Sequence, residues 1–274
     1  MKGKNSSTCY LWDETIANRG GQEIGSCLYL HLKNLPAEIT EINMYSDCCP
    51  GQNKNILIAV MLLTILHEFS LTGRQITINH KFLVPGHTHM EADTIHAAIE
   101  KTKKCTTANI HVPRDWANLI RPVPKNPPIK VVEVQQCQFL NFKQLLGGIF
   151  QHRKTTTMGS AVIWSQIRWI QYRTTDLGTV FYKNSVCPNE EFNILDLTRK
   201  RLRNVPMTQL VPISDTPLLL PSLKIQNLKE LIPYIDANSR PYYETFLKTL
   251  SPSQTADEYY PDEEPPSNDD EDLV

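Results

Sequence analysis

Two acidic side chains follow predicted β-strands at positions where a metal-dependent phosphoryl-transfer enzyme would hold its ligands. Asp47 follows the run 39–46, and Asp93 stands beyond the run 75–84 and a turn at Gly86. Sites in α/β sheets gather at the carboxyl ends of strands. Mg²⁺ and Mn²⁺ take carboxylate oxygens and keep several waters for substrate phosphates. We therefore predict that Asp47 and Asp93 contribute to a site for one of these ions.

A helix predicted from about residue 91 to residue 104 would carry the second part of this site. Asp93, His96 and Glu100 are three and four residues apart, so they share one face of that helix. Asp93 would lie in the first turn, where the helix dipole favours the ionised form. Asp93 and Glu100 are therefore candidate metal ligands beside Asp47. The alternative is that Asp93 is only an N-terminal-turn acid and that Glu100 is a surface residue.

The same segment offers nitrogen ligands for a different metal. His87, His89 and His96 accompany Asp93, and imidazole-rich sites suit Zn²⁺. Their spacing matches no standard zinc motif, so histidines that order the loop are the alternative. Gly86 would let the chain turn sharply there and point backbone donors into the site.

Three clusters of basic side chains could contact phosphates. Phosphate contacts need Lys or Arg at many points and do not by themselves specify a sequence. The alternative is that these charges are solvated surfaces. The clusters consist of Lys101, Lys103 and Lys104, of Arg153 and Lys154, and of Arg199, Lys200, Arg201 and Arg203.

Acidic residues are concentrated at the C-terminus, which leaves the rest of the chain basic. Nine of the 29 acids follow Ala256, with no Lys or Arg among them, so the preceding residues carry 20 acids against 28 bases. A positive body suits a polyanion, which makes DNA a candidate partner, and the acidic tail could occupy the same surface in its absence. The alternative is a solvated body with a tail that only aids solubility.

Neither an export signal nor a membrane span is visible in the sequence. The N-terminus is polar, and the longest apolar run, 56–66, is too short for a bilayer. Seven scattered cysteines do not suggest a disulfide framework, and we expect Cys48 and Cys49 to be small packing residues. We expect a nuclear or cytoplasmic protein that is not secreted, with no membrane partner and no small-molecule cofactor. The oligomeric state stays open.

The first half of the chain alternates between strand and helix patterns. Such alternation predicts an α/β fold, a sheet covered by helices. The apolar residues of helix 56–68 occur on nearly every side, so this helix should be sandwiched rather than lie on the surface. The predicted elements are strand 9–12, helix 22–35, strand 39–46, helix 56–68, strand 75–84 and helix 91–104.

The character of the chain changes after Lys104. A short helical piece opens at Pro113, and the prolines of 122–128 predict a stiff linker. Short β-like runs follow at 130–134, 162–164 and 180–183, and periodicity does not decide between strand and helix for 163–170. We therefore divide the chain into a core (1–121), a linker (122–128), a small, mostly β attachment (129–221), a helical hairpin (222–250) and a disordered acidic tail (251–274).

Several short motifs, taken in order, resemble a transposon-associated, uncharacterised family of animal proteins. The core of that family is similar to the ribonuclease H-like fold of DDE transposases and retroviral integrases. The resemblance extends over about Leu11 to Leu250 and is weakest between Pro124 and Pro221. The motifs are Trp12-Asp13-Glu14, Arg19-Gly20, Glu23-Ile24, Ser26-Cys27-Leu28, Tyr45-Ser46-Asp47, Gly51-Gln52-Asn53, Lys81-Phe82-Leu83, Gly86-His87-Thr88, Asp93 and Ile99-Glu100.

This resemblance implies roles for the acidic residues. Asp47 would be the second catalytic acid and Asp93 the third, with Glu100 as a substitute and His87 as a helper near the scissile phosphate. The first acid has no counterpart, because the chain begins at what would be the third strand. The sheet would then lack its central strand, which leaves an open edge beside 39–46.

Two functional hypotheses follow. The first is a transposase-derived, ribonuclease H-like domain whose ancestral activity is Mg²⁺-dependent DNA strand cleavage or transfer, incomplete and inactive in this chain. The second is a domesticated, non-catalytic module that binds nucleic acid or a protein partner, since a binding module would tolerate a missing strand better than an enzyme.

Overall fold

The computed structural model describes the chain except for residues 1–5, 85, 87–88, 152, 200–209 and 250–274. The described residues form two compact units, and each unit is built from separate stretches of sequence. The sheet unit comprises residues 19–88 and 137–213. The helical unit comprises residues 1–18, 89–136 and the chain from Ser214 to the end of the last helix. The predicted disordered tail lies outside the described residues.

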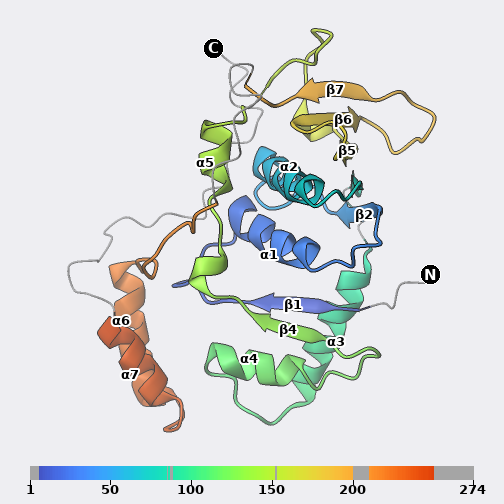
Figure 1. The fold of residues 1–274 in the computed structure, drawn as a ribbon. Helices are drawn as coiled ribbons and strands as arrows, with labels where there is room; N and C mark the ends of the chain where they lie inside the picture. The colour runs from blue at the N-terminus through green and yellow to red at the C-terminus, as the bar shows by residue number, and fades with distance from the viewer. Residues whose placement is uncertain (1–5, 85, 87–88, 152, 200–209, 250–274) are drawn as a thin grey trace. The chain divides into compact units, whose positions relative to one another are not determined.

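A mixed five-stranded sheet is the centre of the sheet unit (Figure 1). The strand order is β2-β3-β5-β6-β7, so β2 is an edge strand. β2 runs parallel to β3, and every other neighbouring pair is antiparallel. The strands are β2 (Glu41–Ser46), β3 (Thr77–Phe82), β5 (Trp169–Arg173), β6 (Thr179–Lys183) and β7 (Asn193–Asp196).

Helix α2 (Ile56–Leu71) connects the two parallel strands and is buried along most of its length. Asn55 starts it, because its side-chain oxygen accepts the backbone N–H groups of Leu57 and Ile58 at 3.0 and 3.1 Å. One side of α2 contacts β5, and the other sides contact α1 (Gly21–Lys33) and α5 (Phe142–Gly147). The predicted sandwiched helix is therefore confirmed.

One side of the sheet, which we call the inner face, forms the core together with these helices. Residues alternate between the two sides of a strand, so every second side chain points inward. Ile78, Ile170, Tyr172 and Val180 lie on the inner face and belong to the same apolar cluster as Phe142 of α5. Full burial of such a side chain stabilises the fold by about 1.5–3 kcal/mol.

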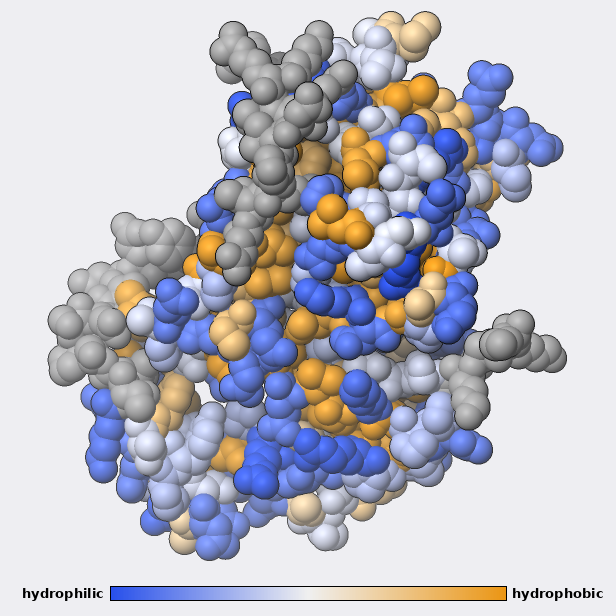
Figure 2. Space-filling view, in the orientation of Figure 1, coloured by the Kyte–Doolittle hydropathy of each residue, from blue (hydrophilic) through white to orange (hydrophobic). Residues whose placement is uncertain are grey.

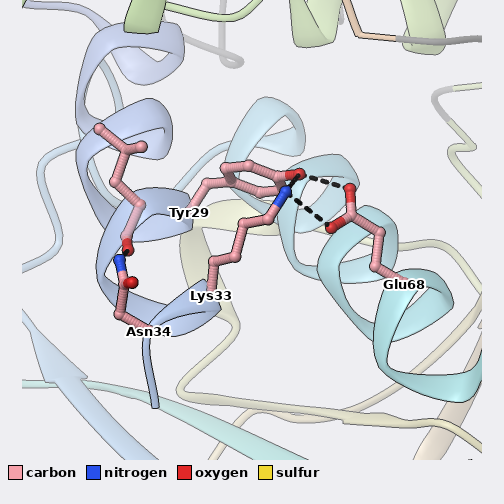
Figure 3. A network of polar contacts seen from close by, with 5 residues as sticks. Tyr29, Lys33, Asn34 and Glu68 are labelled. Atoms are coloured by element: carbon pink, nitrogen blue, oxygen red, sulfur yellow. Dashed lines mark hydrogen bonds and ion pairs between the residues drawn. The ribbon is translucent and has the colours of Figure 1, made fainter. Parts of the chain in front are cut away.

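A polar network joins α1 to α2 at the edge of this core (Figure 3). The Tyr29 hydroxyl donates a hydrogen bond to the Glu68 carboxylate, and the Lys33 ammonium lies 3.5 Å from that carboxylate. Burial and the bond to Glu68 both raise the pKa of Tyr29. Asn34, which ends α1, donates its amide to the Leu30 carbonyl at 2.6 Å. The network therefore fixes the C-terminal half of α1 against α2.

The helical unit has a smaller core around two parallel strands, β1 (Thr8–Leu11) and β4 (Lys130–Glu133). Ile99, Ile120, Val123 and Ile129 are its buried apolar residues. Val123 lies within the proline-rich stretch and Ile129 directly follows it, so the predicted linker is anchored inside this unit. The helices are α3 (Glu91–Cys105), α4 (Pro113–Ile120), α6 (Ser222–Leu231) and α7 (Arg240–Thr249).

Strand pairing corrects the predicted β attachment. β5, β6 and β7 do not form a part of their own but continue the sheet that β2 and β3 begin, while β4 pairs with β1. Within the predicted run 162–164 there is no strand, and the 3-10 helix η2 (Trp164–Gln166) begins there. Within the described residues, two further 3-10 helices are η1 (Gln136–Gln138) and η4 (Ile232–Tyr234).

The predicted α/β class, with a mixed sheet flanked by helices and with C-terminal helices, is confirmed. The ribonuclease H-like topology stays a prediction of the resemblance. On the face drawn in Figure 2, apolar side chains of the described residues are interrupted by hydrophilic ones.

Candidate functional site

Asp47 stands directly after β2 and organises the turn that leads to α2. Its Oδ1 accepts the backbone N–H of Cys49 at 3.0 Å and the side-chain amide of Asn53 at 2.7 Å. The Cys49 carbonyl in turn accepts the N–H groups of Asn53 and Lys54 at 2.9 and 3.0 Å. One carboxylate oxygen of Asp47 therefore holds the loop in shape.

Asp93 lies in the first turn of α3, as predicted. Its Oδ2 accepts the backbone N–H of Met90 at 2.8 Å, which satisfies one of the unpaired donors at this helix end. His96 and Glu100 are exposed farther along the same helix. The observed contact of Asp93 is that of a capping acid, the structural alternative considered for this residue.

The three candidate metal ligands are divided between the two units. Asp47 belongs to the sheet unit, whereas Asp93 and Glu100 belong to the helical unit. His87 lies outside the described residues. No group of three or more His, Cys, Asp or Glu side chains in the described part of the chain is arranged to hold a metal ion. A site for Mg²⁺, Mn²⁺ or Zn²⁺ therefore stays a prediction.

The predicted phosphate-binding clusters are only partly described. Lys101, Lys103 and Lys104 are exposed on α3, and the Lys103 ammonium lies 4.8 Å from the centroid of the Trp116 ring. Arg199 is exposed, and its Nε donates to the Phe150 carbonyl at 3.3 Å. The rest of that cluster, Lys200, Arg201 and Arg203, lies outside the described residues.

The side of the sheet opposite the core carries a row of alternating aromatic and cationic side chains. We call this side the outward face; on β2, β3 and β5 it consists of Glu41, Asn43, Tyr45, Thr77, Asn79, Lys81, Trp169, Gln171 and Arg173. Tyr45 is paired with Lys81, Lys81 with Trp169, and Trp169 with Lys183 of β6. The Lys81 ammonium lies 5.7 Å from the Tyr45 ring centroid and 4.3 Å from that of Trp169.

A second row, next to the first, is made of amides. Asn43 is paired with Asn79, and Asn79 with Gln171. Asn79 is the centre of this row: its Oδ1 accepts the Trp169 indole N–H at 3.0 Å and the Gln171 amide at 2.8 Å. Its own amide donates to the Glu41 carboxylate at 3.1 Å. The amide row therefore fixes the position of the Trp169 ring.

The outward face is accessible at its β2 end and covered toward β7. Tyr45 is 56% exposed, and Lys81, Trp169 and Arg173 are half-buried. At the other end Phe192 packs edge-on against Trp169, with the ring centroids 5.3 Å apart. Lys183 is buried there, and its ammonium donates hydrogen bonds to the carbonyls of Cys187 and Pro188. Lys183 is therefore a structural cation, whereas Lys81 is partly exposed.

Sequence reasoning missed this face because it depends on pairing between distant strands. Lys81 and Trp169 are neighbours only because β3 and β5 pair. The available signal was the alternation within 169–173, where Ile170 and Tyr172 are buried and their neighbours are not. The residues before it obscured this alternation, since Trp164 and Ile167 are also apolar but lie outside the strand.

The buried side chains of the sheet unit include a histidine and a lysine. Burial lowers the pKa of His80 to about 4, and its Nε2 lies 2.9 Å from the Ser46 hydroxyl. Lys54 is 4% exposed and donates to the Ser165 carbonyl. Burial lowers the pKa of Lys54 and nearby Arg168 lowers it further, while Cys48 acts in the opposite direction. His80 is thus a neutral core histidine at neutral pH.

No protein-family model matches the chain, and no curated protein and no solved structure matches it. The transposon-associated family and its nuclease chemistry therefore remain what the sequence motifs predict. Among the described helices, none has both the length and the apolar character that crossing a bilayer requires. The functional argument must accordingly be made from the outward face itself.

Proposed function

We propose that this chain is a non-catalytic nucleic-acid-binding module and that it binds through the outward face. The observation that carries the proposal is the row Tyr45, Lys81 and Trp169, in which one ammonium lies close to two aromatic rings on an accessible part of the sheet. Nucleic acids present negative phosphates and flat bases, and a surface that binds them combines cations with aromatic rings.

The charge of the chain supports this ligand. The residues up to Ala256 carry eight more bases than acids. On β2, β3 and β5 the outward face contributes Lys81 and Arg173 against the single acid Glu41. Arg173 is held in place, because its Nε donates to the Gln171 side chain at 2.7 Å and its guanidinium carbon lies 4.0 Å from the centroid of the Phe181 ring.

Metal-dependent DNA cleavage remains the alternative that the resemblance implies. We expect little or no nicking in Mg²⁺ or Mn²⁺, because one carboxylate oxygen of Asp47 already holds a turn and one of Asp93 already caps a helix. A supercoiled-plasmid nicking assay of the full chain and of Asp47→Asn tests this. Asn can still accept the Cys49 N–H, so nicking that disappears in Asp47→Asn would establish the catalytic alternative.

A salt titration of oligonucleotide affinity tests the binding proposal. We expect the logarithm of the association constant to fall linearly with the logarithm of the salt concentration, because bound phosphates release counterions. Lys81→Gln should weaken binding and reduce this slope by roughly 0.7–0.9, the value for one phosphate contact. Lys143→Gln removes the same charge from an exposed position of α5 and should leave both quantities unchanged.

The proposal fails if neither single-stranded nor duplex oligonucleotides bind, or if the affinity does not depend on salt. It also fails as a proposal about this face if Lys81→Gln and Lys143→Gln have the same effect. A protein partner would then be the surviving form of the binding hypothesis.

A further inference from the structure

We infer that the ligand of the outward face is an unpaired nucleic-acid strand whose neighbouring bases stack on Tyr45 and Trp169, with the phosphate between them at Lys81. This inference rests on the proposed function and specifies its ligand. It goes beyond general phosphate binding because it assigns a separate role to each ring.

The spacing of the two rings selects an unpaired strand. Tyr45 and Trp169 stand on β2 and β5, with β3 between them. Neighbouring strands lie about 4.8 Å apart, so residues two strands apart are separated by roughly 10 Å. Successive bases of a duplex strand are only about 3.4 Å apart along the axis. Two bases can therefore reach both rings only if they are unpaired and unstacked from one another.

Lys81 is placed to serve the phosphate that connects two such bases. It lies between Tyr45 and Trp169 in the register, and its ammonium is within 5.7 Å of both ring centroids. In the unbound protein this ammonium lies against the rings. An accessible lysine–ring contact is weaker than the stacking of a base on an aromatic side chain. A base can therefore displace the ammonium from the ring, and the flexible lysine can then reach the adjacent phosphate.

Trp169 is held ready for stacking by its neighbours. Its indole N–H is bonded to Asn79, which is only 3% exposed, Phe192 packs against the ring in a T-shaped arrangement, and the Lys183 ammonium lies 4.8 Å from the ring centroid. A ring that is already fixed loses little conformational freedom when a base stacks on it. Tyr45, on the edge strand, is the more exposed of the two rings and has Asn43, a hydrogen-bonding side chain, two residues away on the same face.

The charge pattern on this side of the sheet also favours a strand with regularly spaced phosphates. Arg173 lies four residues after Trp169 on the same face of β5 and offers a second cation along the sheet. Glu41 is at the opposite end of β2 from Tyr45, so the one acid contributed by β2, β3 and β5 is removed from the stacking pair.

The test compares a mixed-sequence single strand with a hairpin duplex of the same sequence, using fluorescence anisotropy and the full chain. We expect the single strand to bind at least about tenfold more tightly than the duplex, since only its bases can stack. Tyr45→Leu and Trp169→Leu should each weaken single-strand binding by about 5- to 100-fold, the range for one stacked base. Neither should change the salt slope, because the phosphate contact remains.

The matched control is Tyr234→Leu, which removes a tyrosine that is 85% exposed in the helical unit and should leave affinity unchanged. Circular dichroism establishes that each variant is folded. If Trp169→Leu does not fold, Tyr45→Leu decides the question together with photo-crosslinking of a thiouracil-containing strand. Crosslinks are expected in residues 41–46 and 169–173, and crosslinks confined to other segments would overturn the inference.

The outcomes separate this inference from the proposed function. Equal affinity for duplex and single strand overturns the inference and leaves nucleic-acid binding intact. The inference is also overturned if Tyr45→Leu binds the single strand as tightly as the control variant Tyr234→Leu does. Absence of binding to either oligonucleotide removes both proposals together.

Discussion

The two faces of the five-stranded sheet are built from alternate residues of the same strands, yet they differ in chemistry. On β3 and β5 the inner face presents Ile78, His80, Ile170 and Tyr172, and all four are buried in the sheet unit. The outward face of the same strands presents amides, cations and an indole ring. The inner face explains why the sheet is stable, whereas the outward face needs a further explanation.

Cross-strand pairs alone are a weak explanation for the outward face. Such pairs stabilise a sheet by about 0.2–1 kcal/mol each, and alternating small polar residues would satisfy an exposed face. The outward face instead exposes more than half of Tyr45 next to Lys81. Residues that contribute little to stability but combine charge with aromatic surface are typical of binding sites. The comparison therefore assigns most of the apolar stabilisation to the inner face and supports the binding role proposed for the outward face.

The largest expected effect is on the inner face. Ile78→Ala should lower the free energy of unfolding by about 2–5 kcal/mol, because Ile78 is fully buried and its truncation leaves a cavity. Urea denaturation measures this loss, provided that the dependence of the unfolding free energy on urea concentration is the same for both proteins. Tyr45→Leu on the outward face should change stability by less than about 0.5 kcal/mol. Similar losses for the two substitutions would contradict the division of roles between the faces.

The next effect concerns the one histidine of the inner face. The pKa of His80 is about 4 in the folded protein, below the ordinary value of 6.5, because burial disfavours the charged form. As the pH falls, the unfolded chain therefore takes up this proton first. The contribution of neutral His80 is complete above pH 6.5 and is lost as the pH falls toward 4, a decrease of about 3 kcal/mol.

His80→Gln should remove this part of the pH dependence, as measured by urea denaturation between pH 7 and pH 4. The amide can still interact with Ser46 but does not titrate in this range. His96→Gln, at an exposed position of α3, is the control and should retain the full decrease. If the two variants follow the same pH curve, His80 is not the residue that links acid to unfolding.

Local patterns were sufficient to predict most elements of the first half of the chain. The apolar residues of 56–66 predict α2 without reference to any other segment, and the structure adds Asn55 as its cap. The strands that complete the sheet were harder, because 163–170 contains apolar residues with no clear period. Only the antiparallel pairing of β5 with β3 determines that Trp169 starts a strand and that Trp164 does not.

The candidate site shows the same limit. Asp47 and Asp93 were found because each lies next to a predicted element, and the structure describes both as acceptors of backbone N–H groups. The outward face was not found, because Tyr45, Lys81 and Trp169 become neighbours only across three strands. Local sequence can place an acid at the end of an element, but register between distant strands creates this surface.

Another substitution tests whether the buried amide of Asn79 holds the Trp169 ring in place. Asn79→Leu removes the acceptor for the Trp169 indole N–H and the Gln171 amide, which are 3.0 and 2.8 Å from Asn79 Oδ1. We expect a loss of about 1–3 kcal/mol in unfolding free energy, because buried donors are left without partners. Single-strand affinity should fall as well, since the ring loses its fixed position. Unchanged affinity in the folded variant would show that Trp169 needs no such support.

The smallest expected effect comes from the acid of the outward face. Glu41→Gln should leave stability within about 0.5 kcal/mol, because the Gln oxygen can still accept the amides of Asn43 and Asn79. Removal of the negative charge should raise single-strand affinity by about 2- to 3-fold at low salt, the size of an exposed charge interaction. The gain should vanish at high salt, where exposed charges are screened.

Glu38→Gln provides the control for this gain, because Glu38 is exposed in the loop before β2 and has the same charge. A change in net charge alone would give both variants the same small increase. A charge effect that belongs to the outward face would appear only in Glu41→Gln, because only Glu41 shares that side of the sheet with Lys81 and Trp169. The difference between the two variants therefore measures how far the bound phosphates extend along β2 from Tyr45.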